Sequence, residues 1–246
     1  MCFSDSARVP EPPIKGEVGQ HGDLTLTASD GNKLMAYAAR AGQSRGIGLV
    51  ILPDIRGLHN YYKDLSNAFA GTGIDTVAID YFGRTAGHGE RTDDWDYRPH
   101  VAQTTPEGVA LDTGAAVAYL RSPEGGKVEK IFTVGFCFGG SCSWNQAAAG
   151  HNLSGSIGFY GRPERSEPFI AEMANPLLIL IAGADRGIPG SAYVEFDHEL
   201  NRAGVKHEMH TYPGAPHSFF DRTFAEWQDA CQDAWQRMLG FIDQNA

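Results

Sequence analysis

A hydrophobic run that ends in a glycine-flanked cysteine decides the fold: VEKIFTVGF (128–136) is followed directly by CFGG (137–140). The apolar run predicts a buried strand, and the small residues after it begin a helical pattern over 139–149. Gly135, Cys137 and Gly139 have the spacing G-x-C-x-G, which is the G-x-S-x-G turn with cysteine in place of serine. The segment therefore predicts a sharp strand-to-helix turn that lifts the Cys137 side chain clear of a sheet.

Strand and helix patterns alternate on both sides of this turn. The expected strands are 46–54, 75–80, 128–136, 155–161, 176–183 and 206–213, and the expected helices are 61–72, 107–120, 139–149, 192–203 and 223–243. An antiparallel hairpin over 24–28 and 33–39 precedes them. Such alternation predicts an α/β fold with a mostly parallel, doubly wound sheet and helices on both faces. In sheets of this kind the site lies at the carboxyl ends of the strands.

The chain of 246 residues is expected to form one domain. Residues 1–22 read as an irregular N-terminal arm, and the domain is expected to span 23–246. Residues 83–105 fit neither a helix nor a strand and follow the carboxyl end of a strand. Long insertions of this kind are often functional, so we expect a lid, with a plain surface loop as the alternative.

Composition excludes several classes of partner. The net charge is −10 and the pI is about 5.3, which argues against nucleic acid and anionic membranes because both need a basic face. No apolar run approaches the roughly eighteen residues of a membrane span, and residues 1–20 lack the pattern of a signal peptide. A cytoplasmic protein, as a monomer or small homo-oligomer, is expected. The four cysteines are too scattered for a disulfide framework or a zinc site, so no metal is expected.

The position of Cys137 has a chemical consequence. A thiol at a helix N-terminus is favoured as a thiolate, because the free N–H groups and the helix dipole stabilise negative charge. The same groups favour an oxyanion. We expect one N–H donor from Phe138 and a second from Ile55, after the strand 46–54. The alternative is that Cys137 is a small buried hydrophobic residue, as many free cysteines are.

Two further residues follow strand ends in the order that this fold requires. Asp185 comes just after the strand 176–183, and His217 lies in the loop after the strand 206–213. A nucleophile followed in the chain by an acid and then a histidine is the order found in α/β-hydrolases. His217 then serves as a base for Cys137, and Asp185 orients it.

At this point the chain resembles the dienelactone hydrolase family, the carboxymethylenebutenolidases, which have the α/β-hydrolase fold. The resemblance runs from about residue 20 to the C-terminus, and its motifs are LPDIRGL (52–58), DYFGR (80–84), GFCFGG (135–140), GADRGIP (183–189) and PGAPHSFFDR (213–222). Members hydrolyse the lactone ring of dienelactones, which are anionic intermediates of aromatic degradation. The resemblance implies a small-molecule ester or lactone substrate and no cofactor.

The resemblance also implies a catalytic group. The family triad corresponds to Cys137, Asp185 and His217. An acidic residue that helps activate the thiol corresponds to Asp54, but the family usually has glutamate there and aspartate is one methylene shorter. The alternative role for Asp54 is that of a turn residue after Pro53.

Substrate-binding residues are implied in the same way. The family binds the substrate carboxylate with arginines, and Arg84 matches one of them. Arg222 lies near the second but is offset by one residue, and Arg56 is a candidate from its proximity. Tyr160 and Ser218 match pocket-lining positions, although Tyr160 also suits core packing. Each arginine has the alternative role of a solvated surface charge.

Three hypotheses follow. The first is a cofactor-free hydrolase of a small, anionic lactone or ester that acts through a cysteine nucleophile and an acyl-enzyme. The second is a broader carboxylesterase or thioesterase with a neutral substrate, which differs in whether Arg84 and Arg222 point into the pocket. The third is a redox-sensing protein in which Cys137 is a reactive thiol, although a sensor needs neither Asp185 nor His217.

Overall fold

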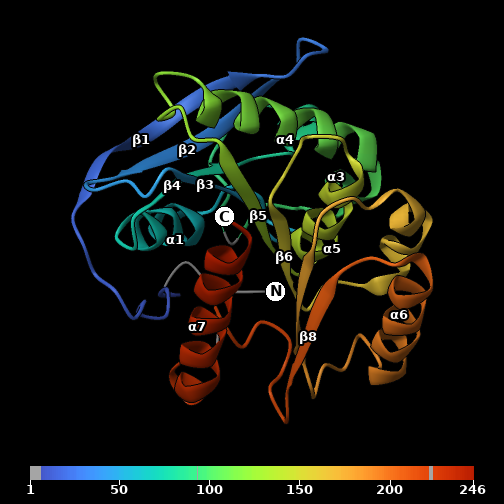
Figure 1. Cartoon of the computed structure of the whole chain (residues 1–246). Coiled ribbons are helices and arrows are strands. Elements are labelled where there is room, and N and C mark those ends of the chain that lie inside the picture. The colour runs from blue at the N-terminus through green and yellow to red at the C-terminus, as the bar shows by residue number, and fades with distance from the viewer. Residues whose placement is uncertain (1–6, 93, 222–223) are drawn as a thin grey trace.

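The computed structural model describes residues 7–92, 94–221 and 224–246, and one sheet organises them. Eight strands run in the order β1-β2-β4-β3-β5-β6-β7-β8 (Figure 1). β1 pairs with β2, and β2 with β4, in antiparallel fashion, whereas every neighbouring pair from β4 to β8 is parallel. This confirms the mostly parallel sheet that the sequence predicts.

The elements lie close to their expected positions. The strands are β1 (Val18–Thr27), β2 (Lys33–Ala41), β3 (Ile47–Leu52), β4 (Ile74–Ile79), β5 (Lys130–Phe136), β6 (Gly155–Phe159), β7 (Leu177–Ala182) and β8 (His207–Tyr212). The longer helices are α1 (Asn60–Ala70), α4 (Pro106–Arg121), α5 (Phe138–Asn145), α6 (Gly190–Ala203) and α7 (Gln228–Asn245). No helix within the described ranges has both the length and the apolarity that crossing a membrane requires.

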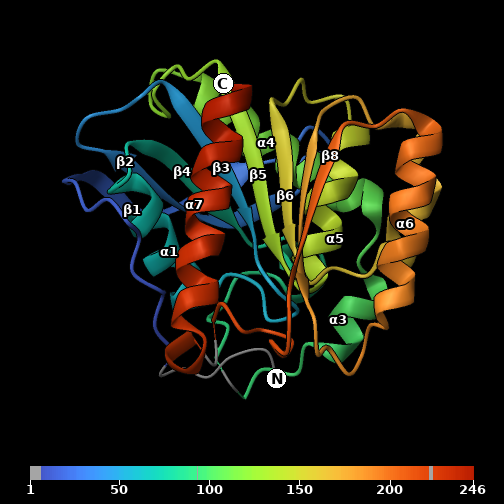
Figure 2. The same cartoon turned by 60° about the horizontal axis from the view of Figure 1, so that its bottom comes forward.

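Helices cover both faces of the sheet, with α1 and α7 on one face and α4, α5 and α6 on the other (Figures 1 and 2). The central strand β3 shows why. Its residues Leu49 and Ile51 belong to the core beneath α1 and α7, whereas Val50 and Leu52 belong to the core beneath α4. Alternate side chains of a strand point to opposite faces, so an unbroken apolar run buries itself in both directions.

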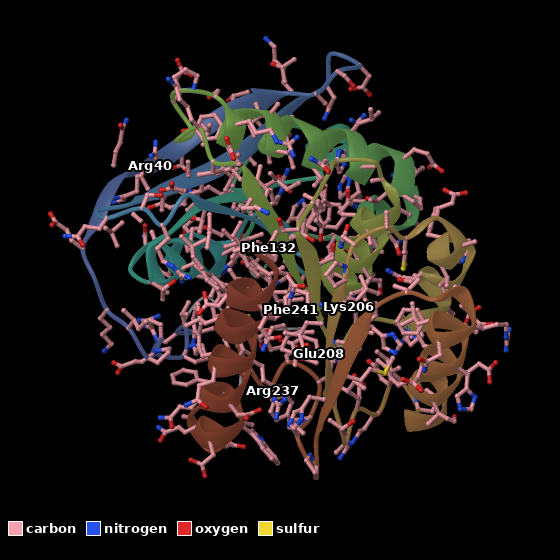
Figure 3. The ribbon with its side chains drawn as sticks, viewed as in Figure 1. Arg40, Phe132, Lys206, Glu208, Arg237 and Phe241 are labelled. Atoms are coloured by element: carbon pink, nitrogen blue, oxygen red, sulfur yellow. The ribbon has the colours of Figure 1, made fainter. Side chains whose placement is uncertain are left out.

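The C-terminal helix α7 is anchored on the middle of the sheet. The Phe241 ring of α7 meets the Phe132 ring of β5 edge-on at 6.2 Å between centroids, and Figure 3 labels both residues. A Cβ atom at Gly155 of β6 would lie 2.6 Å from the Phe241 ring. Glycine at this position therefore makes room for the aromatic ring, and α7 settles directly over β5 and β6.

The N-terminal segment is part of the folded body. β1 begins at Val18, so the prediction of an irregular arm over 1–22 is wrong for residues 18–22. Before it, the Trp235 indole N–H donates to the carbonyl oxygen of Pro10 at 2.9 Å, and Val9 packs against the core beneath α7. Backbone and side chain therefore hold this segment against α7.

Residues 83–105 are not the unstructured insertion that the sequence suggests. Two short helices, α2 (Gly83–Ala86) and α3 (Arg98–Gln103), lie within them. The Trp95 ring contacts the Phe82 ring at 5.4 Å and stacks on the His100 ring at 5.2 Å. These contacts attach the segment to the body, and its role as a lid stays a prediction.

A buried ion pair completes this attachment. The Arg91 guanidinium contacts the Asp80 carboxylate at 2.7 Å, and both side chains are almost wholly buried. Burial raises the pKa of Asp80 above its ordinary value of 3.8, against the lowering effect of Arg91. The ion pair therefore joins residues 83–105 to the end of β4, where Asp80 follows the strand.

We predict that Arg91→Ala lowers the free energy of unfolding by about 3–5 kcal/mol near neutral pH, because it leaves the Asp80 charge buried without its partner. An acid with a raised folded-state pKa contributes stability that is present below its unfolded pKa and is lost as the pH rises through its folded pKa. The loss in Arg91→Ala should therefore be smaller in mildly acid solution. Urea unfolding at the two pH values measures both effects.

The matched control is Arg98→Ala in the same segment, because the Arg98–Asp96 pair is mostly exposed and such pairs contribute little. Equal destabilisation in the two variants, or a loss in Arg91→Ala that does not depend on pH, would contradict the role of the buried pair.

Candidate active site

The turn between β5 and α5 gives Cys137 an unusual backbone. Its φ is 57° and its ψ is −113°, a region that side-chain-bearing residues rarely occupy. The turn is held by hydrogen bonds from the Cys137 N–H to the Phe159 carbonyl at 3.1 Å and from the Gly140 N–H to the Cys137 carbonyl at 3.0 Å. Strained backbone of this kind persists only where the surrounding structure enforces it, and it clusters at functional sites.

Three glycines make the turn sterically possible. A Cβ atom at Gly135 would lie 1.8 Å from the Gly139 carbonyl oxygen, and one at Gly139 would lie 2.1 Å from that of Leu52. A Cβ atom at Gly140 would lie 2.4 Å from the Phe159 carbonyl oxygen. Backbone therefore meets backbone on three sides of the turn, and no larger residue fits these positions.

His217 and Asp185 meet beside the turn. The His217 Nδ1 atom lies 2.5 Å from the Asp185 Oδ2 atom, and the other carboxylate oxygen accepts the Gly187 N–H at 2.8 Å. The Asp185 side chain is 2% exposed and the His217 side chain 29%. The sequence order thus brings the two side chains together although 32 positions separate them.

The electrostatics keep Asp185 ionised. Burial raises its pKa, but the hydrogen bonds from His217 and the Gly187 N–H, together with the charges of His217 and Arg162, outweigh burial and the pKa is lowered. A carboxylate that stays charged at neutral pH can accept a hydrogen bond from the Nδ1–H group of His217 and hold that ring in one tautomer.

Cys137 shares a pocket of about 510 Å³ with these two residues. Its lining comprises Cys137, Arg162, Ala184, Asp185, Arg186, Gly187, Ile188, Pro216 and His217. The three residues of the predicted triad therefore face one space at the carboxyl ends of β5, β7 and β8. This is the arrangement needed for a nucleophile, a base and an orienting acid.

Neither Tyr160 nor Ser218 lines this pocket. Both are fully buried and both have positive φ, 37° for Tyr160 and 64° for Ser218. The Tyr160 ring lies 4.8 Å from the His217 ring, and its hydroxyl donates to Asp221 at 3.2 Å. The expectation that Tyr160 and Ser218 line the pocket is corrected, because both side chains are fully buried and neither belongs to the pocket lining.

The loop after β3 places Asp54, Ile55 and Arg56 behind the turn. The fully buried Asp54 accepts the Arg56 N–H with Oδ1 at 2.8 Å, and its own N–H donates to the Tyr62 hydroxyl at 3.0 Å. Arg56 is fully buried and does not line the pocket, contrary to the expectation of a substrate contact. Ile55 is half-buried and packs against the same core as Cys137.

Arg84 forms ion pairs with carboxylates of the protein itself. Its guanidinium contacts Asp112 at 2.8 Å and Asp30 at 2.7 Å, and its Nε atom also donates to the Gly108 carbonyl. Arg84 does not line the Cys137 pocket. The expectation that it anchors a carboxylate is therefore wrong, because two carboxylates of the protein already occupy it. Arg222 lies outside the described residues.

Sequence reasoning missed Arg162 and Arg186, which both line the Cys137 pocket. A signal was available, since Arg162 follows β6 and Arg186 follows β7 at the edge where Asp185 and His217 also lie. The sequence motifs assign no role to either arginine. Their place just after a strand end was therefore the only signal that could have identified them.

A second pocket of about 350 Å³ lies against α5. It is lined by Val101, Thr104, Thr105, Pro106, Val109, Phe138, Ser141, Cys142, Asn145, Gln146, Glu164, Arg165, Pro168 and Phe169. Phe138, which lines this pocket, directly follows Cys137, which lines the first one. In the part of the chain that the structure describes, no three His, Cys, Asp or Glu side chains are grouped to hold a metal ion.

Known proteins of similar sequence cover most of the chain. A protein of Escherichia coli (strain K12) named "Putative carboxymethylenebutenolidase" is 27% identical over 233 residues, which cover 90% of this chain and 86% of that protein. A protein of the same name from Saccharolobus solfataricus is 28% identical over an alignment of 256 positions. The alignment covers 87% of this chain and 95% of that protein.

Solved structures of similar shape share the α/β-hydrolase fold. A "Putative Dienelactone Hydrolase" from Klebsiella pneumoniae subsp. pneumoniae has a TM-score of 0.80 at 23% identity, with 93% of this chain and 100% of that chain covered. Brefeldin A esterase, a bacterial homologue of human hormone sensitive lipase, has a TM-score of 0.70 at 17% identity, with coverage of 98% and 81%. The family model of the dienelactone hydrolase family matches residues 34–246, and this chain therefore belongs to that family.

Proposed function

We propose that the protein is a cofactor-free hydrolase of small esters or lactones in which Cys137 is the nucleophile, His217 the base and Asp185 the orienting acid. The observation that carries this proposal is the 2.5 Å contact between His217 and Asp185 in a pocket that Cys137 also lines. A base held by an acid beside a nucleophile at a helix N-terminus is the arrangement of acyl-transfer enzymes.

The first half of the reaction forms an acyl-enzyme. His217 takes the thiol proton as the Cys137 Sγ atom attacks the substrate carbonyl carbon. The carbonyl oxygen becomes an oxyanion, which accepts hydrogen bonds from the backbone N–H groups of Phe138 and Ile55. When the carbon–oxygen bond of the ester breaks, His217 returns the proton to the leaving alkoxide. In a lactone the leaving hydroxyl stays attached to the acyl group.

The second half releases the acid. His217 takes a proton from water, whose oxygen attacks the thioester carbon, and the same N–H groups stabilise the second oxyanion. The carbon–sulfur bond then breaks, and His217 gives its proton back to the Cys137 thiolate. Asp185 accepts a hydrogen bond from the His217 Nδ1–H group throughout, which leaves Nε2 to exchange protons with thiol and water.

Asp54 has two candidate roles. As an activator it would accept the thiol proton when substrate arrives. As a turn residue it would fix the loop that carries the Ile55 N–H, and its 2.8 Å bond from the Arg56 N–H supports this second role. In both roles Asp54 is a fully buried residue that does not line the Cys137 pocket.

A carboxylesterase or thioesterase with a neutral substrate is the second candidate. The observation that favours it is the loss of Arg84 as a carboxylate anchor, together with the apolar lining supplied by Ala184, Ile188 and Pro216. A redox sensor is disfavoured, because burial raises the pKa of the Cys142 thiol to about 12. Such a thiol is a poor partner for a disulfide with Cys137.

We predict that Cys137→Ala removes the turnover of para-nitrophenyl acetate, because it removes the thiol that is proposed to attack the carbonyl carbon. Iodoacetamide should inactivate the wild-type protein with one equivalent bound at Cys137. The matched control is Cys142→Ala, one turn along the same helix, which should retain turnover. Wild-type turnover in Cys137→Ala would overturn the proposed nucleophile.

We predict that His217→Ala lowers kcat by on the order of a hundredfold or more, the usual scale for loss of a general base. Asp185→Asn should also lower kcat, because the neutral amide no longer stabilises the imidazolium and its N–H groups can hold His217 in the wrong tautomer. Steady-state kinetics with circular dichroism separates these effects from unfolding. Near-normal kcat in both folded variants would mean that a different base acts on Cys137.

The two roles of Asp54 give different outcomes for Asp54→Asn, which keeps the shape and removes the charge. The turn role predicts that kcat and its pH profile change little, because the amide oxygen still accepts the Arg56 N–H. An activating role predicts a fall in kcat and a shift of the pH profile. We expect the first result, and the pH dependence of kcat measures it.

A further inference from the structure

Arg162 is held rigidly beside the nucleophile at its backbone. Its N–H donates to the Ser141 Oγ atom at 2.7 Å, and the Ser141 hydroxyl donates to the Arg162 carbonyl at 3.1 Å. The preceding Gly161 carbonyl accepts the Tyr193 hydroxyl at 2.8 Å. Since Ser141 lies in α5, which begins just after Cys137, the base of the Arg162 side chain is fixed relative to the thiol.

The guanidinium group of Arg162 is held less firmly than its backbone. Its Nη1 atom contacts Glu164 Oε1 at 3.2 Å, and the two side chains are 46% and 52% exposed. Exposed pairs of this kind contribute little to stability. Glu164 lines the second pocket, whereas Arg162 lines the pocket of Cys137, so the pair stands between the two spaces and can open at little cost.

Arg162 also points toward the triad end of its pocket. A Cβ atom at Gly187 would lie 3.4 Å from the Arg162 Nη2 atom and 3.5 Å from Asp185 Oδ1. Burial raises the pKa of Asp185, whereas its hydrogen bonds with His217 and Gly187 lower it. The charge of Arg162 lowers the pKa further. The guanidinium therefore acts electrostatically on the site.

Two other arginines considered for a substrate carboxylate, Arg84 and Arg56, are differently placed, and Arg222 lies outside the described residues. Arg84 is paired with the fully buried Asp112 and with Asp30, and Arg56 is itself buried. Among the described residues, the cations that line the Cys137 pocket are Arg162 and Arg186. The protein carries a net charge of −10, so an anionic substrate requires local positive charge to approach the thiol.

We propose that Arg162 binds the carboxylate of anionic substrates, exchanging its contact with Glu164 for the substrate while the scissile carbonyl lies at Cys137. This inference rests on the proposed hydrolase function. A planar guanidinium on a fixed backbone suits a carboxylate, because it offers two parallel N–H donors and keeps its charge at every pH the protein meets. Glu164 competes for it at rest and so discriminates against weakly binding anions.

The test compares two esters with the same leaving group: para-nitrophenyl butyrate, which is neutral, and the mono-para-nitrophenyl ester of glutaric acid, which carries a carboxylate. We expect Arg162→Gln to lower the ratio of kcat/KM for the anionic ester over the neutral ester about tenfold, mainly through KM. Glu164→Gln should raise the same ratio, because it removes the competitor. Salt should reduce both effects.

Two controls define specificity. Arg202→Gln removes an exposed charge on α6, away from the pocket lining, and should leave the ratio unchanged. Arg186→Gln removes a charge from the same pocket and reports the general field, so its effect should be smaller than that of Arg162→Gln. An equal fall in kcat/KM for both esters in Arg162→Gln, or a larger change of the ratio in Arg186→Gln, would overturn the proposal.

A binding assay keeps this test independent of turnover. Glutarate should slow the alkylation of Cys137 by iodoacetamide in a saturable way, and about tenfold more glutarate should be needed in Arg162→Gln. If the wild type hydrolyses neither ester but glutarate protects through Arg162, the proposed hydrolase function fails and the anion site stands. If protection is the same in both proteins, the anion site fails whatever the turnover.

Discussion

The site depends on one close approach of backbone to backbone, where Gly139 meets the end of β3. A Cβ atom at Gly139 would lie 2.1 Å from the Leu52 carbonyl oxygen and 2.2 Å from that of Pro53. This approach sets the first turn of α5 against the loop that carries Asp54 and Ile55, and it forces Cys137 into its strained conformation. The backbone N–H groups of these two segments are the ones that the proposed mechanism assigns to the oxyanion.

Around this contact, the parallel sheet brings distant parts of the chain to a single edge. Asp54, Cys137, Arg162, Asp185 and His217 each follow a different strand, so the register of the sheet fixes their spacing. The sheet also determines where the arginines after its strands lie. Arg84, which lies in α2 after β4, binds the hairpin turn to α4 through Asp30 and Asp112, whereas the arginines after β6 and β7 line the pocket. Similar side chains thus serve the fold in one place and the pocket in another.

Much of this could be predicted from the sequence because its signals are local. The strands β3 and β7 are buried runs of apolar residues and glycine, and the glycines at 135 and 139 mark the turn at Cys137. Where the signal is not local, prediction failed. The first half of β1 is partly exposed and polar, so residues 18–22 resemble a coil. Arg84 was mistaken for a substrate ligand because its partners Asp30 and Asp112 lie 54 and 28 positions away in the sequence. Arg162 was missed because it belongs to none of the recognised motifs.

The central claim is that an acyl group passes through the Cys137 sulfur, and acid-quenched intact-mass spectrometry tests it most directly. The protein is mixed with para-nitrophenyl acetate, quenched within the first turnovers and digested to locate any added mass. The account predicts one acetyl group per chain, on the peptide that contains Cys137, which forms with the release of nitrophenolate and disappears when the ester is exhausted. Steady ester hydrolysis with no acetyl group on Cys137, or with the acetyl group on another residue, would contradict it.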